Sequence, residues 1–129
     1  MRKRSDPQVR RQLRAAVLAA GAKKAQDPVL LDLRERADFC DYFFLCHGAN
    51  PAQIQAIAEA VEERLVQEFR LQPAHREGAR EGEWRVLDYL DFIVHIFSTR
   101  SRRFYDLERL WRGAPTLRLP AGAEAEPAS

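Results

Sequence analysis

Cysteine and long apolar runs are scarce in this 129-residue sequence. Its two cysteines, Cys40 and Cys46, lie in one short segment that faces no second cluster of cysteine or histidine, which favours neither a disulfide scaffold nor a zinc site. No apolar run approaches the ~18 residues of a membrane span. The N-terminal residues also lack the apolar stretch of a secretory signal. We therefore expect one compact domain in the reducing cytoplasm, away from membranes.

Charge is unevenly distributed along the chain. Residues 1–26 carry eight basic side chains and one acidic one, a net +7, whereas residues 27–112 carry 12 basic and 16 acidic side chains, a net −4. A basic arm on an acidic body can contact RNA phosphates at one end and a basic protein at the other. Mixed charge also keeps ordinary helix faces solvated, so charge alone leaves both interpretations open.

Short apolar runs bounded by turn residues predict five strands. They lie at about 28–33, 41–46, 74–77, 84–89 and 92–97. Residues 34–40 are too few for a helical crossover, so we expect the first two strands to be antiparallel. A tight turn at Leu90-Asp91 joins the last two strands.

Apolar residues at helical spacing predict three helices. The first begins after Asp6, and the second begins after Asn50, with Gln53 completing a capping box. The third begins after Ser98 or Ser101 and places Phe104, Leu107 and Trp111 on one face. The fold class is therefore α/β, a single domain over residues 1–112 with a mixed sheet of about five strands and flanking helices. Residues 113–129 hold too little apolar surface to fold, so we expect a disordered tail.

The residues that carry catalysis or bind metals in other proteins form no convincing site here. Asp88 and Asp91 could hold a metal, but acidic residues are common beside tight turns. Cys46 and His47 are adjacent on a strand, so their side chains point to opposite faces. No serine nucleophile elbow or phosphate-binding glycine loop is present. We expect a protein that is not an enzyme.

His95 is the one polar residue in an otherwise apolar strand. Most such histidines are hydrogen-bonded in the core. The alternative is a functional residue, exposed on one sheet face beside the strand that carries Trp84 and Asp88. Trp84 is equally open to two interpretations, as a core residue or as an interface anchor.

Several segments form a specific pattern along the chain. They are Asp41-Tyr42-Phe43, Gly82-Glu83-Trp84, Leu87-Asp88-Tyr89, Val94-His95-Ile96-Phe97 and Phe104-Tyr105-Asp106-Leu107-Glu108-Arg109-Leu110-Trp111. In this order and spacing they closely resemble the ribosomal silencing factor family, also called the Iojap family. The resemblance runs from about Leu13 to Trp111, and its motifs are long and non-degenerate.

The resemblance implies an α/β domain of nucleotidyltransferase-like topology without the catalytic residues of those enzymes. It also implies binding to the large ribosomal subunit through ribosomal protein number fourteen. The bound factor would block joining of the small subunit and repress translation when nutrients are scarce. Such a role needs a rigid surface and no cofactor or metal, and an acidic body suits a basic ribosomal partner. A ribosomal RNA contact by the first helix and a homodimer away from the ribosome stay open.

Carried over by position, the docking patch consists of Trp84, Asp88, Tyr89, His95, Tyr105 and Glu108. Trp84 and Tyr89 are the expected anchors, and the two acidic residues would pair with basic groups on the partner. On an ideal strand, however, Trp84 and Asp88 share a face while Tyr89 takes the other. Unless a bulge or the turn reconciles them, one of the two anchors lies in the core.

The sequence departs from the family pattern before the second long helix. Family members usually carry Ser-Gly and then an arginine ahead of the glutamine, where this chain has His47-Gly48 and Ala52-Gln53. Any function of that arginine is therefore missing at Ala52 in this chain. Two other functions remain open: a nucleotidyltransferase-like enzyme that uses Asp88 and Asp91 with magnesium, and a general RNA-binding module that uses the basic first helix.

Overall fold

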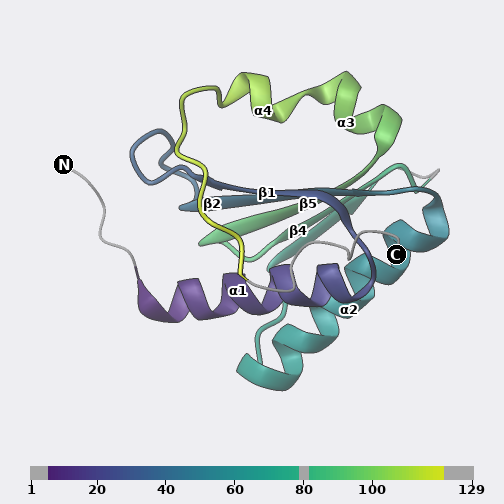
Figure 1. Cartoon of the computed structure of the whole chain (residues 1–129). Coiled ribbons are helices and arrows are strands. Elements are labelled where there is room, and N and C mark those ends of the chain that lie inside the picture. Colours follow the sequence, from purple (N-terminus) through teal and green to yellow (C-terminus); the bar gives the residue numbers. More distant parts are fainter. Residues whose placement is uncertain (1–5, 79–81, 121–129) are drawn as a thin grey trace.

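A five-stranded mixed sheet organises the chain in the computed structural model, which describes residues 6–78 and 82–120 (Figure 1). The strands are β1 (Gln26–Asp32), β2 (Tyr42–Gly48), β3 (His75–Gly78), β4 (Trp84–Asp88) and β5 (Phe92–Ser98). Their order across the sheet is β1-β2-β5-β4-β3. The pairs β1/β2, β5/β4 and β4/β3 are antiparallel and β2/β5 is parallel, which confirms the predicted mixed sheet and the antiparallel first pair.

Helices cover both faces of the sheet. The long helices α1 (Pro7–Ala22) and α2 (Pro51–Phe69) lie against one face, and the short helices α3 (Thr99–Tyr105) and α4 (Leu107–Leu110) lie over the other (Figure 1). Within the described residues, none of these helices has the length and apolar content that a bilayer crossing requires.

The N-caps of the long helices follow the sequence prediction. The Asp6 carboxylate accepts the Gln8 N–H at 2.8 Å, and the Asn50 side chain accepts the Gln53 N–H at 2.8 Å. The reciprocal bond of the predicted capping box is displaced, because the Gln53 side-chain oxygen accepts from Ala49 rather than from Asn50. The Gln53 amide nitrogen also donates to the carbonyl oxygens of Lys23 and Lys24, so it ties the start of α2 to the end of α1.

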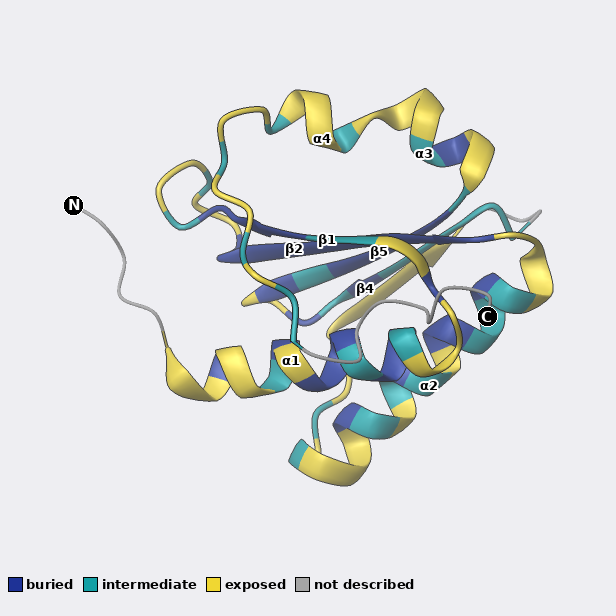
Figure 2. Cartoon of the chain, viewed as in Figure 1, coloured by how far each residue is buried: buried dark blue, intermediate teal, exposed yellow. Residues whose placement is uncertain are grey.

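Side chains of the central strands alternate between two cores. The ribbons of β2 and most of β5 are coloured as buried in Figure 2. On β5, Val94 and its even-numbered neighbours pack toward α1 and α2, whereas Phe97 and the other odd-numbered residues face α3 and α4. All seven residues of β2 are buried, since both of its faces are covered. This explains why the sequence shows a continuous apolar run there instead of an alternating one.

The C-terminal helix differs from the prediction. Instead of one helix through Trp111, the chain breaks at Asp106, which adopts a left-handed conformation with φ of 44° and separates α3 from α4. Leu107 and Trp111 pack on the sheet as expected, but Phe104 is 80% exposed. The break rotates α3 relative to α4, so the three residues no longer share one face.

The first part of the expected disordered tail is ordered. The Pro115 carbonyl accepts the Asp32 N–H at 2.8 Å, and the Leu117 N–H donates to Leu30 at 2.9 Å, so residues 115–117 run along the outer edge of β1. Leu117 and Leu119 pack against the core beneath α1. The prediction of a disordered tail is therefore wrong for residues 113–120. Residues 121–129 lie outside the described part of the chain.

Candidate docking face

Three of the predicted site residues come together on the sheet face beneath α3 and α4. In the β4/β5 register, Trp84 lies opposite Phe97, Val86 opposite His95, and Asp88 opposite Ile93. Strand alternation places these side chains on one face. The predicted grouping of Trp84, Asp88 and His95 therefore exists in the structure.

Tyr89 lies on the other side of the sheet. It is 4% exposed, stacks on Phe92 with ring centroids 5.0 Å apart, and belongs to the core that α1 and α2 cover. No bulge between Trp84 and Asp88 changes the alternation. The expectation of Tyr89 as a surface anchor beside Trp84 is therefore not met, because the two rings point to opposite faces.

Trp84 forms the centre of an aromatic cluster. Its ring stacks on Phe97 at a centroid distance of 5.4 Å, and Tyr105 of α3 lies 4.7 Å from it. Farther across the same face, Phe43 of β2 makes an edge contact with His95 of β5, with ring centroids 4.6 Å apart. Such pairs hold each other in fixed orientations, so the cluster is a rigid platform.

An open hollow of about 460 Å³ lies beside this cluster. Its lining combines apolar and aromatic side chains with other polar ones: Phe39, Phe43, Trp84, Val86, Ile93 and His95, together with His75, Glu77 and Asp88. Phe39 is 57% exposed although it contacts both Phe43 and Trp111. The hollow therefore offers an apolar floor with two carboxylates among its lining groups.

The adjoining surface of α3 and α4 is also apolar. Phe104 is 80% exposed, Leu110 is 71% exposed and Tyr105 is 48% exposed. A second hollow between them is lined by Arg103, Asp106 and Arg109 as well. Contiguous exposed apolar groups of this kind mark interaction surfaces. We call this whole surface, from the Phe39–Trp84 hollow to Leu110, the docking face.

Sequence reasoning missed part of the docking face. Phe39 lies in the loop between β1 and β2, where no periodicity indicates which way a side chain points. Phe104 and Leu110 lie in a segment that the pattern predicts as one helix, but the break at Asp106 separates α3 from α4 and both side chains are exposed. The one local indication was the density of aromatic residues in FYDLERLW.

His95 is buried, 7% exposed, and neither of its ring nitrogens has a hydrogen-bond partner within the described chain. The expected hydrogen-bonded core histidine is therefore not what the structure contains. Burial lowers the pKa of His95 to about 4, since a charged imidazolium would lose its hydration among these rings. The ring is neutral at pH 7, and it serves the docking face as a flat packing element.

Glu108 is engaged within the protein. Its carboxylate accepts from Nε of Arg102 at 2.8 Å, and Nη1 of the same arginine lies 3.0 Å from Nδ1 of His47. Burial, with help from the Arg102 charge, lowers the pKa of His47. Arg102 also donates to the carbonyl of Gln26 at 3.4 Å. Glu108 therefore helps to hold α3 and α4 on the sheet, although its side chain remains 42% exposed.

The residues considered for catalysis have structural explanations. The Asp88 carboxylate accepts the Leu90 N–H at 2.8 Å and so stabilises the β4–β5 turn. Burial raises the pKa of the Cys46 thiol to about 12, which leaves it without thiolate character at neutral pH. Across residues 6–78 and 82–120, no group of three or more histidine, cysteine or carboxylate side chains is placed to hold a metal.

Comparison with known proteins gives a consistent result. Residues 6–129 match the family described as "Ribosomal silencing factor during starvation". The chain is 36% identical over 107 residues to the ribosomal silencing factor RsfS of Halalkalibacterium halodurans, covering 83% of this chain and 91% of that one. It is 36% identical over 110 residues to the RsfS of Bacillus subtilis, covering 85% and 92% respectively. A crystal structure from Chromobacterium violaceum superimposes with a TM-score of 0.77 at 26% identity, covering 89% of this chain and 94% of that one.

Proposed function

Because the chain belongs to the ribosomal silencing factor family, we propose that it binds the large ribosomal subunit and represses translation by keeping the small subunit from joining. The partner on the subunit would be ribosomal protein number fourteen, and the repression would operate when nutrients are limiting. We also propose the cytoplasm as its location, where such a factor would meet ribosomes. A molecule that blocks by occupying space needs a rigid face and a body behind it, and no reactive group.

The observation that supports this proposal most strongly is the docking face. Trp84 contacts both Phe97 and Tyr105, so packing restricts its orientation before a partner arrives. Fixed aromatic side chains bind with little loss of rotamer entropy, which is why they dominate interface energetics. Glu77 and Asp88 line the hollow with negative charge, which suits a basic partner such as a ribosomal protein.

Substitution on the docking face tests the proposal. Tyr105→Ala and Trp84→Ala should each weaken binding to isolated large subunits by about thirtyfold, which corresponds to a hot-spot loss of ~2 kcal/mol. Co-sedimentation with purified large subunits measures this. Val66→Ala is the matched control, because Val66 is 40% exposed on α2 and belongs to the opposite side of the sheet.

Two outcomes decide the result. Weakened binding by both aromatic variants, with V66A unchanged, supports the docking face. If Y105A and W84A remain folded by circular dichroism and co-sediment like the unsubstituted chain, the docking face is not the contact. Tyr105 is the safer of the two positions, since it is 48% exposed and contributes less to the core than Trp84.

Two finer proposals concern other contacts of the same protein. The basic start of α1 would touch ribosomal RNA, since Arg10, Arg11 and Arg14 are all exposed on it. Away from the ribosome, a second copy would cover the apolar docking face and form a homodimer. Sedimentation velocity distinguishes the dimer, because Y105A should shift the chain toward monomer if the docking face is shared.

A further inference from the structure

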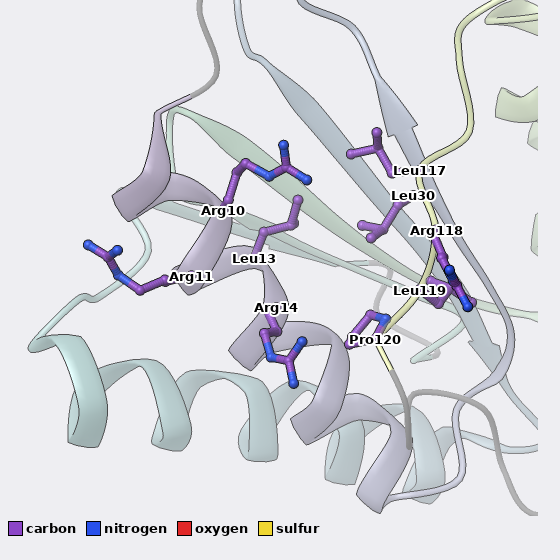
Figure 3. A pocket seen from close by; sticks show the side chains of 9 residues that line it. All are labelled: Arg10, Arg11, Leu13, Arg14, Leu30, Leu117, Arg118, Leu119 and Pro120. Atoms are coloured by element: carbon purple, nitrogen blue, oxygen red, sulfur yellow. The ribbon is translucent and has the colours of Figure 1, made fainter.

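A second pocket lies on the opposite side of the sheet from the docking face. It has a volume of about 370 Å³ and opens between α1, β1 and the C-terminal segment (Figure 3). Its lining is Arg10, Arg11, Leu13, Arg14, Leu30, Leu117, Arg118, Leu119 and Pro120. Leu13 and Leu30 belong to the core that α1 and α2 cover, so the pocket shares no wall with the docking face. The proposed protein contact through the docking face leaves it unused, whereas the proposed RNA contact of α1 would share three of its arginines.

The pocket has a preformed apolar floor. Leu13 and Leu30 are 3% and 4% exposed, so both are fixed by packing. The C-terminal wall is held in place because the Leu117 N–H donates to the Leu30 carbonyl at 2.9 Å. Leu119 continues this wall, and Pro120 faces Arg14 across the opening (Figure 3).

The rim of the pocket is strongly basic. Four arginines line it, and no aspartate or glutamate does. Among the described residues, the guanidinium groups of Arg14 and Arg118 have no hydrogen-bond or ion-pair partner. Arg11 differs, because its guanidinium donates to Gln8 at 2.7 Å and points away from the leucines (Figure 3).

The positions of these arginines on α1 are unfavourable for the helix itself. Apart from the N-cap Asp6, α1 has no acidic residue near its start, and Arg10, Arg11 and Arg14 lie in its N-terminal half, toward the positive end of the helix dipole. Arg10 and Arg14 are also an i, i+4 pair of like charge, which destabilises a helix. A bound anion would relieve both effects. A ligand with negative charge would therefore add to the stability of α1.

We infer that this pocket binds a nucleoside polyphosphate, with its phosphates on Arg14 and Arg118 and its base against the leucines. Several guanidinium groups suit a ligand with more than one negative charge, and they bind phosphate oxygens in a bidentate manner. The leucine floor suits an apolar, flat group such as a base. A volume of about 370 Å³ falls in the range of small-molecule sites.

Isothermal titration of the full chain with four probes tests the ligand class. ADP is the nucleoside polyphosphate, pyrophosphate carries the charge without a base, laurate carries an apolar chain with one charge, and a ten-uridine RNA carries a strand of phosphates. ADP should bind at least tenfold more tightly than pyrophosphate and laurate. If pyrophosphate or laurate binds as tightly as ADP, or if ADP does not bind, the inference is overturned.

Three variants that each remove one positive charge locate the site. Arg14→Gln and Arg118→Gln should each weaken ADP binding about tenfold, whereas Arg11→Gln should change it by no more than about twofold, because its guanidinium faces away. All three side chains are exposed, so thermal unfolding should confirm intact folds. The inference is overturned if R11Q weakens binding as much as R14Q and R118Q do and the RNA binds more tightly than ADP. That result would indicate an open RNA-binding surface.

Discussion

His95 is a residue whose environment sets a clear pH dependence. Its pKa is lowered to about 4 in the fold by burial, against about 6.5 in an unfolded chain. Between these values the unfolded state binds more protons than the folded state, so stability falls as the pH falls from 6.5 toward 4. The lowered pKa of His47 acts in the same direction.

We therefore predict that His95→Phe removes much of the sensitivity to acid. The difference in free energy of unfolding between the unsubstituted chain and H95F should change by about 3 kcal/mol from pH 7 to pH 4, in favour of the variant. Urea unfolding at each pH measures it. His75→Asn is the control, because His75 is exposed on β3 and H75N keeps the buried ring. A constant difference between H95F and the unsubstituted chain at all pH values would contradict the burial of a neutral imidazole.

At the scale of single residues, strand alternation allowed part of the candidate site to be predicted. It placed Trp84 and Asp88 on one face and Tyr89 on the other, and the structure has this arrangement. The contact of Phe43 with His95 could not be predicted, because it depends on the parallel pairing of β2 with β5 across a long stretch of sequence. Nor does a sequence show that the nitrogens of a buried histidine lack partners.

At the scale of elements, the strands and the two long helices were predictable within a few residues. Short apolar runs end at turn residues, and Asp6 and Asn50 cap the helices as their side chains allow. The break between α3 and α4 was missed, since aspartate adopts a left-handed conformation only occasionally and the apolar spacing continues through Asp106. Residues 115–117 were missed because an edge pairing with β1 is decided by the sheet and not by their own composition.

The C-terminal segment is predicted to be part of the folded unit. Truncation after Arg112 removes the two backbone hydrogen bonds to β1 and the packing of Leu117 and Leu119. We expect a loss of about 2 kcal/mol in the free energy of unfolding, since each bond and each half-buried leucine contributes ~1 kcal/mol before the ordering entropy is subtracted. Chemical denaturation measures this loss.

Truncation after Pro120 is the matched control for this prediction, because it keeps every one of these contacts. It should unfold at the same denaturant concentration as the full chain and still co-sediment with large subunits. Equal stability of the two truncated chains would contradict the structural role of residues 113–120.

At the scale of the whole molecule, the sheet separates two surfaces with different chemistry. The face under α3 and α4 exposes Phe39, Tyr105 and Leu110, and carboxylates lie nearby. The opposite side carries the arginine-lined pocket beneath α1. A partner protein on the docking face would leave the pocket accessible, so anion binding is measured on the isolated chain, where no RNA competes for the arginines of α1.

The central claim is that this protein prevents ribosomal subunits from joining. Purified large subunits are incubated with excess protein, small subunits are added, and the fraction of joined ribosomes is measured by sucrose-gradient sedimentation. We predict that the joined fraction falls as the protein is added, and that Y105A requires about thirtyfold more protein for the same effect. If saturating protein leaves the joined fraction unchanged, the account is contradicted, whether or not the protein is bound to the large subunit.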